Sequence, residues 1–427
     1  MRQAFGPADI LLPKENVKME TWSVIACDQY TSEPNYWRNV EKLVGRRPSA
    51  YHLILPEAYL GQVDVEQTWM DIEAEMDRYM KGFLKTYKNA MIYVERTMRD
   101  GRVQPGLVGC IDLEEYDYHK GSESMLRATE ATVEERLPSR IAIREHAPLE
   151  LPHILVLIDD EKNTVIEPLK KASEYQERLY DFDLMMEGGH LRGWLLGENE
   201  QRRVLNALNH LAREDVFHEK YGSDAGAVME YAVGDGNHSL AAAKAYYEEL
   251  KAQNPGKDLS YHPARYALVE LENLHSPTLK FEPIHRIVKH VNVNQLLKEM
   301  KDELGIVDNT KWLEPEKEQQ VVYSVIKGKK EKLIITEPTS KLTVGTLQNF
   351  LDDYLEHNKG EIDYVHGNGT LYNLSKEPDS IGFLLPPMPK EKLFPTVIFE
   401  GALPRKTFSI GNAQDKRYYT EARKIVE

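Results

Sequence analysis

The chain has 427 residues and a formal net charge of −15, from 54 Lys and Arg against 69 Asp and Glu. Hydrophobic residues make up 41% of it and charged residues 29%, which excludes the wholly disordered and fibrous classes. The acidic balance repels a phosphate backbone and argues against general nucleic-acid binding.

The first part of the chain predicts an α/β region that contains a hairpin. The apolar run 22–26 predicts a short strand, and apolar residues spaced by three or four predict a helix within 56–79. Segments 91–96 and 103–112 flank an Asp-Gly turn, which is typical of a hairpin. The continuous apolar run 154–158 predicts a buried strand.

The middle of the chain alternates predicted strands and helices. Apolar and β-branched runs predict strands over 187–197, 230–233 and 266–272. Between them, amphipathic or alanine-rich patterns predict helices over 200–213 and 239–251.

From about residue 287 the pattern changes. Two strands are predicted around a basic turn, followed by a helix, a strand and a further ordered segment, over 321–326, 332–336, 346–356, 381–385 and 401–410. A charged helix is predicted from there to Glu427.

These elements predict a mixed α/β (α+β) fold with hairpins and intertwined sub-domains. We expect an N-terminal α/β region over 1–150 and a core region over 151–290. A C-terminal α+β region over 291–427 is expected to return its Pro-Arg-Lys-Thr segment, 404–407, to the core.

The number of cysteines and the lengths of the apolar runs indicate the cellular compartment in which the protein is expected. Cys27 and Cys110 are too few for a disulfide framework, which favours a reducing environment. The N-terminal segment lacks the pattern of a signal peptide, and no run approaches 18 apolar residues. We therefore expect a cytoplasmic protein with no membrane segment; whether it is a homo-oligomer stays open.

The most informative stretch is the loop 234–239, which reads Gly-Asp-Gly-Asn-His-Ser between a predicted strand and a predicted helix. Glycine backbone and the free N–H groups of a helix start together form an anion site. Asp235 is suited to hold Mg²⁺ or accept a proton, and His238 to donate to a phosphoryl oxygen. The alternative is a capped turn in which these residues only shape the chain.

Three weaker groups of residues are candidates to converge on this loop. Segment 127–130 combines Arg127 and Glu130, although a solvated helix start explains it as well. His285 and Arg286 form a pair that suits phosphate or carboxylate, and the segment 404–407 places two cations beside a hydroxyl. A carboxylate base, a metal-binding acid and several cations are what phosphoryl transfer needs.

Several familiar site motifs are absent from the sequence. It contains no Walker motif, no kinase-type Gly-x-Gly-x-x-Gly, no zinc-type His and Cys spacing and no Gly-x-Ser-x-Gly elbow.

The order of landmarks resembles the conserved family called domain of unknown function number 1015. Its central signature A-D-G-H-H-R-[YF]-x-x-A aligns with residues 233–242, and its H-E-x-T with residues 129–132. Its H-x-L-W resembles the segment 190–194, its P-T-H-R matches 283–286, and its G-x-x-M-P-x-K-[ST]-T-x-F matches 401–408. Asn237 and Ser239 stand where the signature has His and Arg, and Thr129 stands where H-E-x-T has His.

The core of that signature is similar to the ParB/sulfiredoxin-like fold and to the free serine kinases built on it. The resemblance implies a Mg²⁺-dependent and nucleotide-dependent kinase that phosphorylates a small hydroxylated metabolite such as serine, with ATP or ADP as donor. It implies catalytic roles for Asp235, which would also hold the metal, for His238 and for Glu130. Phosphate contacts are expected from Gly234, Gly236, Asn237, Ser239, His285, Arg286, Arg405, Lys406 and Thr407.

Two other functions remain open at this point. The first is a nucleotide-binding switch or scaffold without turnover, as in ParB-like proteins. The second is an inactive descendant, which the loss of the signature Arg at Ser239 favours, because it removes a bidentate phosphate contact.

Overall fold

The computed structural model describes residues 3–31, 33–132, 137–308 and 319–427. The chain forms two compact units. Unit 1 comprises Met1–Lys280, Val397–Gly401 and Ile410–Glu427, and unit 2 comprises Phe281–Thr396 and Ala402–Ser409. The three-part division expected from the sequence is a different partition and stays a prediction.

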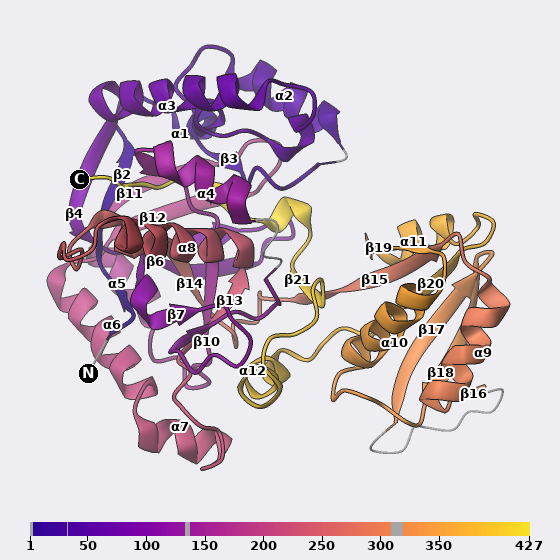
Figure 1. The fold of residues 1–427 in the computed structure, drawn as a ribbon. Helices are drawn as coiled ribbons and strands as arrows, with labels where there is room; N and C mark the ends of the chain where they lie inside the picture. The colour runs from indigo at the N-terminus through magenta and orange to yellow at the C-terminus, as the bar shows by residue number, and fades with distance from the viewer. Residues whose placement is uncertain (1–2, 32, 133–136, 309–318) are drawn as a thin grey trace. The chain divides into compact units, whose positions relative to one another are not determined.

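Unit 1 is built on a ten-stranded mixed sheet (Figure 1). Its strands, in sheet order, are β11 (Glu177–Asp183), β12 (His190–Leu195), β5 (Ile92–Thr97), β6 (Val103–Asp112), β14 (Tyr266–Asn273), β10 (Leu155–Ile158), β13 (Tyr231–Asp235), β8 (Leu126–Arg127) and β7 (Tyr116–Asp117), with β1 (Phe5–Gly6) beside β6.

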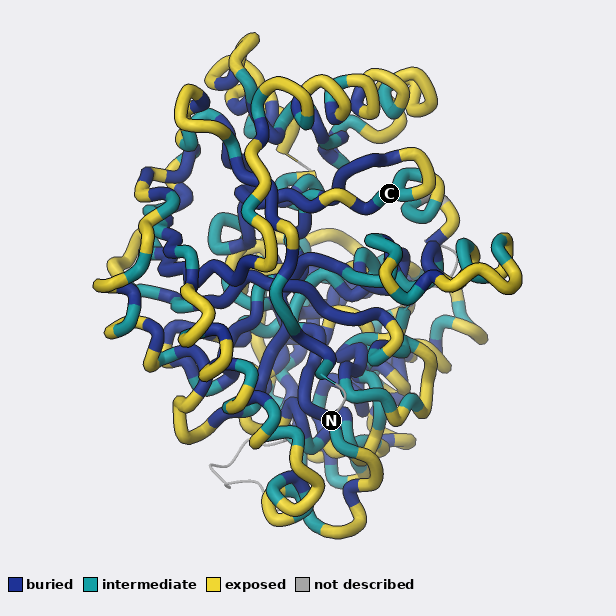
Figure 2. The backbone as a smooth tube through the Cα atoms, turned by 90° about the vertical axis from the view of Figure 1, so that its left-hand side faces the viewer, coloured by how far each residue is buried: buried dark blue, intermediate teal, exposed yellow. Residues whose placement is uncertain are grey.

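Both faces of this sheet are covered, because successive side chains of a strand point to opposite faces. In β5, Ile92 and Val94 pack into one hydrophobic cluster and Tyr93 into another. The first cluster includes residues of α2 (Pro34–Val44) and α3 (Val65–Gly82). The second includes Leu240 and Tyr247 of α8 (Asn237–Gln253). The central strands are buried along most of their length, as Figure 2 shows.

Unit 1 contains further helices on and beside this sheet (Figure 1). They are α1 (Met19–Trp22), α2 (Pro34–Val44), α3 (Val65–Gly82), α4 (Leu137–His146), α5 (Leu169–Ala172), α6 (Glu198–Leu211) and α7 (Glu214–Tyr221). Helix α12 (Leu393–Glu400) lies where the chain passes from unit 2 to unit 1.

The C-terminal segment overturns one expectation. Residues 411–427 form no charged helix; they contain β22 (Tyr418–Tyr419) and β23 (Ala422–Lys424). Strand β22 pairs with β3 (Val24–Ile25), while β23 completes a four-stranded sheet with β4 (Leu84–Ala90), β2 (Ala8–Pro13) and β9 (Leu149–Glu150). Pairing with distant strands and burial of the tyrosines outweigh the local helical tendency.

Unit 2 contains a seven-stranded sheet and three helices in its described residues. The sheet order is β16 (Val307–Asp308), β18 (Lys329–Ile335), β17 (Gln320–Ile326), β20 (Ile381–Leu384), β15 (Phe281–Lys289) and β19 (Glu361–His366), with β21 (Phe408–Ile410) beside β15. The helices are α9 (Val293–Leu304), α10 (Thr343–His357) and α11 (Asn368–Leu374).

The mixed α/β class predicted from the sequence is therefore confirmed. Both predicted hairpins form, as β5–β6 and β17–β18, and the predicted strand, glycine loop and helix form as β13 and α8. Among the helices in the described part of the chain, none has the length and apolar character needed to cross a membrane.

One buried carboxyl group of this fold leads to a stability prediction. Glu230, directly before β13, is 6% exposed, and burial raises its pKa to about 8. The folded chain therefore holds this proton up to a higher pH than the unfolded chain does, so the group lowers stability as pH rises from about 4.5 to about 8. We expect Glu230→Gln to match wild type near pH 4 and to exceed it above pH 8, measured by urea unfolding. If the difference in unfolding free energy between Glu230→Gln and wild type were the same at both pH values, this prediction would be wrong.

Candidate functional site

The loop between β13 and α8 turns at Gly236. Its φ is 83°, in the left-handed region, and a Cβ there would lie 3.0 Å from Ile154 Cγ1. Helix α8 begins at Asn237, and Leu240 N donates to Gly236 O at 3.0 Å to close its first turn. The first N–H groups of a helix have no acceptor inside the helix and favour an anion. Ser239 thus lies in this first turn, as predicted.

This conformation predicts a measurable cost for a side chain at the turn. We expect Gly236→Ala to lower the free energy of unfolding by about 1–2 kcal/mol, since an L-residue pays this much in the left-handed region, with a further loss from the Ile154 contact. The control is Gly367→Ala, where φ is 80° and an added Cβ would meet nothing within 4 Å. If urea unfolding showed the same loss of unfolding free energy in both variants, the contact between the added Cβ and Ile154 would contribute nothing to the loss.

Asp235 forms an ion pair with the C-terminal segment. Lys416 Nζ donates to its Oδ2 at 2.7 Å, and Gly236 N donates to its Oδ1 at 2.9 Å. Burial acts to raise the pKa of Asp235, but the nearby Lys416 ammonium outweighs it and the pKa is lowered. Asp235 is therefore a carboxylate at neutral pH, with Lys416 as its counter-ion.

The segment that contains Glu130 lies beside this loop. Strand β8 pairs in parallel with β13, so the residues after both strands lie at the same edge of the sheet. Thr129 N donates to Asn237 Oδ1 at 3.2 Å, and Asn237 Nδ2 donates to Thr129 Oγ1 at 3.3 Å. Glu130 and His238, each next to one of these residues, are both half-buried. The structure thus brings this predicted segment to the loop.

A chain of hydrogen bonds joins the loop to the N-terminal region. Ser239 Oγ and His153 Nε2 are 3.3 Å apart, and His153 Nδ1 is 3.2 Å from the Tyr419 hydroxyl. That hydroxyl also donates to Cys27 Sγ at 3.2 Å. Burial raises the pKa of Cys27 to about 12, so this thiol is a structural partner and not a thiolate nucleophile.

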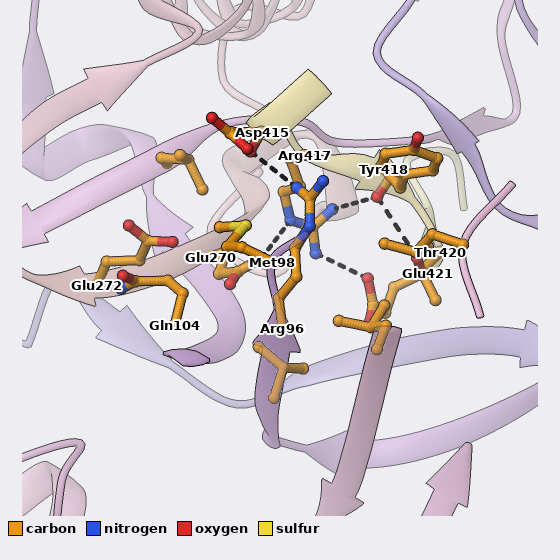
Figure 3. A pocket seen from close by; sticks show the side chains of 14 residues that line it. Arg96, Met98, Gln104, Glu270, Glu272, Asp415, Arg417, Tyr418, Thr420 and Glu421 are labelled. Carbon is orange, nitrogen blue, oxygen red and sulfur yellow. Dashed lines mark hydrogen bonds and ion pairs between the residues drawn. The ribbon is translucent and has the colours of Figure 1, made fainter. Parts of the chain in front are cut away.

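A second set of charges lies on the same sheet, around a cavity of about 40 Å³ (Figure 3). Arg417 donates to Glu270 Oε2 and to Glu421 Oε2, each at 2.7 Å. Arg96 donates to the carbonyl oxygens of Gly188, Gln414, Asp415 and Lys416, and so fastens the C-terminal segment to β5. Residues 414–421 thus supply cations to two neighbouring sets of carboxylates.

The charged residues of this segment were not among the predicted site residues, because the sequence pattern predicted a helix there. Consecutive tyrosines at 418 and 419 favour a strand and were the available signal. Likewise Glu270 and Glu272 are two residues apart in a mostly apolar strand, which places both on one face of the sheet.

The remaining predicted residues belong to unit 2 and are described within it. Arg286 is fully buried and donates to Gln348 Oε1 and to the carbonyl oxygens of Ile284, Lys406 and Arg405. His285 Nε2 is 2.8 Å from Asn368 Oδ1, and its Nδ1 accepts from Leu385 N. In this arrangement both side chains form hydrogen bonds within unit 2. The phosphate contacts expected of them from the sequence stay predictions.

The segment 404–407 presents its cations differently. Arg405 and Lys406 are exposed; Arg405 Nε donates to the Tyr364 hydroxyl at 2.8 Å. Thr407 is buried and donates to Pro404 O at 2.6 Å. Exposed cations in a tight turn suit an anionic ligand, whereas the Thr407 hydroxyl has a structural role in this turn.

Asp235 does not fit a preformed magnesium site. Both of its oxygens are engaged, and one faces an ammonium group, which occupies the place of a cation. In the described residues, the groupings of His, Cys and carboxylate side chains close enough to share a metal are Asp159–Glu161–His275 and Asp353–Glu356–His357, and neither includes Asp235.

The chain is similar to several known proteins. It is 26% identical over 192 residues to glutamate racemase 1 of Caldanaerobacter subterraneus subsp. tengcongensis, covering 44% of this chain and 67% of that protein. Among solved structures it is similar to a free serine kinase in complex with AMP, with 12% identity, a TM-score of 0.39 and coverage of 74% of this chain and 90% of that one.

Two further structures are similar at the same level. They are SbnI with a C-terminal truncation from Staphylococcus aureus (12% identity, TM-score 0.38, 73% and 85% of the two chains) and a conserved hypothetical protein from Pyrococcus furiosus (13%, 0.37, 74% and 94%). The family model described as protein of unknown function (DUF1015) matches residues 9–354, which is more than half of the chain. The chain therefore belongs to the DUF1015 family, which confirms the resemblance seen in its motifs.

Proposed function

We propose that this protein is a nucleotide-dependent phosphotransferase that phosphorylates the hydroxyl group of a small metabolite such as serine. The observation that carries the proposal is the N-terminus of α8, where first-turn N–H groups, an Asp235–Lys416 ion pair and the segment of Glu130 lie together. Phosphoryl transfer depends mainly on positioning and on charge stabilisation, and these groups supply both.

Each group has a distinct role in the proposed reaction. The N–H groups of residues 237–239 bind the phosphate oxygens, and the Lys416 ammonium, held by Asp235, offsets their charge. Glu130 accepts the proton of the substrate hydroxyl as its oxygen forms the new bond to phosphorus. The bond between that phosphorus and the nucleotide oxygen breaks, and the shortened nucleotide leaves with the electron pair. His238 donates to an oxygen of the transferred group.

Magnesium enters this proposal with the nucleotide. Because Asp235 is paired with Lys416, the protein has no vacant carboxylate pair at the loop for a resident ion in the described residues. A magnesium–nucleotide complex is then the donor, and the protein's own cation at the loop is Lys416. The exposed Arg405 and Lys406 belong to unit 2, and their phosphate contacts stay a prediction from the sequence.

Phosphorus NMR tests the proposal directly. Purified protein is incubated with ATP or ADP, magnesium chloride and serine, and then with a pool of hydroxylated metabolites. We expect a new phosphate ester and an equal amount of shortened nucleotide. No ester with either donor and any acceptor of the pool would contradict the proposal.

One observation favours the alternative of nucleotide binding without turnover. The Asp235 carboxylate is engaged by Lys416 and so is a poor proton acceptor in this state, which leaves turnover dependent on Glu130 as the base. A binding protein would be stabilised by nucleotide, by about 2.7 kcal/mol at a hundredfold excess over Kd, while forming no ester. Melting curves recorded beside the NMR series separate the two functions.

A further inference from the structure

The cavity beside the C-terminal segment contains a carboxyl oxygen without a partner. Glu272 is 5% exposed, and its Oε2 is buried with no hydrogen-bond partner. Its neighbour Glu270, two residues earlier on β14, is paired with Arg417. A buried and unpaired acceptor carries a desolvation cost that a bound donor removes.

The nearby guanidinium groups do not provide that donor. The hydrogen bonds of Arg96 go to backbone carbonyl oxygens, and those of Arg417 go to Glu270, Glu421 and the carbonyl oxygens of Pro152 and Tyr418. In the view of Figure 3, Glu272 and Gln104 lie together on one side of the two guanidinium groups. Glu272 therefore faces the cavity beside a second side-chain acceptor.

The charge of the lining favours a cation. Four acidic residues and two arginines line the cavity, so its charge is negative when the acids are ionised. Burial, and then the charge of Glu270, raise the pKa of Glu272, so the carboxyl group keeps its proton to a higher pH than an exposed glutamate does. Arrival of a cation would favour the ionised form and release that proton.

The size and acceptors of the cavity select the kind of cation. A volume of about 40 Å³ has room for a few water-sized groups and not for a nucleotide base. A primary ammonium group has three N–H donors in a compact head. Two acceptors in the cavity lining are Glu272 Oε2 and Gln104 Oε1, and the latter also accepts from Ser276 Oγ at 3.2 Å.

We propose that this cavity binds a primary ammonium group, with Glu272 as its counter-ion and Gln104 as a second acceptor. The class of ligand is a small amine or amino acid. Glu270 and Asp235 both lie opposite Leu155, on strands to either side of β10, so the cavity and the glycine loop share one face of the sheet about 10 Å apart. Assigning the ammonium to the substrate rests on the proposed function, and it names an amino-bearing alcohol as the acceptor.

The test uses the whole chain and three simple salts. Melting temperatures are recorded with methylammonium chloride, tetramethylammonium chloride and potassium chloride at equal ionic strength. We expect saturable stabilisation by methylammonium and none by tetramethylammonium, which has no N–H and is too large. Equal shifts of the melting temperature with all three salts, or no shift with any of them, would overturn the proposal. This measurement uses the wild-type chain alone.

Two matched variants locate the site. Glu272→Gln keeps the shape of the protonated acid and removes its charge, so we expect the methylammonium Kd to rise at least about tenfold. Glu230→Gln makes the same change at a buried glutamate that does not line the cavity, and its Kd should equal that of wild type. Unchanged binding by Glu272→Gln would place the ligand elsewhere and overturn the proposal.

Two further measurements test whether binding releases a proton and whether the bound ammonium group belongs to the substrate. Calorimetry in two buffers of different ionisation enthalpy should show protons released on methylammonium binding to wild type, and none for Glu272→Gln. Stronger stabilisation by L-serine than by L-glycerate, which lacks the amino group, supports a substrate ammonium; equal effects overturn that part alone. Methylammonium binding without any kinase activity would contradict the proposed function and would still support this ammonium site.

Discussion

Asp235→Asn is expected to lower the rate of phosphoryl transfer by about 10²–10³-fold, because it releases the Lys416 ammonium, and removing one group that stabilises transition-state charge typically costs this much. Asparagine keeps the shape of the side chain and an oxygen that can accept from Gly236 N, but it loses the charge that holds the Lys416 ammonium at 2.7 Å. Initial rates from phosphorus NMR at saturating nucleotide measure the effect, and melting temperature reports on folding.

The matched control is Asp159→Asn. Asp159 also pairs with a lysine of unit 1, since Lys220 Nζ lies 2.8 Å from its Oδ1. The two variants lose the same kind of ion pair, so both should lose stability, and only Asp235→Asn should lose transfer. Equal activity in the two variants would mean that the glycine loop is not the reacting site.

Arg417→Met is expected to have the largest effect on stability. Arg417 bridges Glu270 and Glu421, and its side chain is 6% exposed while that of Glu421 is 1% exposed. Removing one partner of a buried pair leaves an unpaired buried charge, which costs about 3–5 kcal/mol. Urea unfolding near pH 7 measures this loss, and the loss should shrink at acid pH as the stranded carboxylates take up protons.

An exposed pair provides the comparison. Arg178 lies 2.6 Å from Asp181, and its side chain is 56% exposed, so Arg178→Met should cost less than about 1 kcal/mol. If the two arginine variants were equally stable, the cluster around Arg417 would contribute little, and the C-terminal segment would be held by Arg96 and its strands alone.

Local patterns were sufficient to predict the loop and its flanking elements. Glycines between an apolar strand and an alanine-rich helix define the turn at Gly236, and this pattern depends on neighbours in sequence. The hairpin β5–β6 was predictable for the same reason, because its Asp-Gly turn and its strands are adjacent in the chain.

The electrostatic partners of the loop were not predictable in this way. Lys416 meets Asp235 across 181 positions of sequence, and β22 pairs with β3 almost 400 residues away. Such contacts depend on the tertiary fold, which overrode the helical pattern of the last residues. The sequence therefore identified the acid of the loop and assigned it to a metal, whereas the fold pairs it with Lys416.

The proposed function requires the N-terminus of α8 to bind the phosphates of a nucleotide. Amide resonances of ¹⁵N-labelled protein, followed during titration with ATP, test this most directly. We expect the amides of residues 236–239 to shift and saturate together, while those of the Gly-Asn-Gly turn at 367–369, which begins α11, stay in place. Unchanged amides at 236–239 in the presence of bound ATP would contradict it.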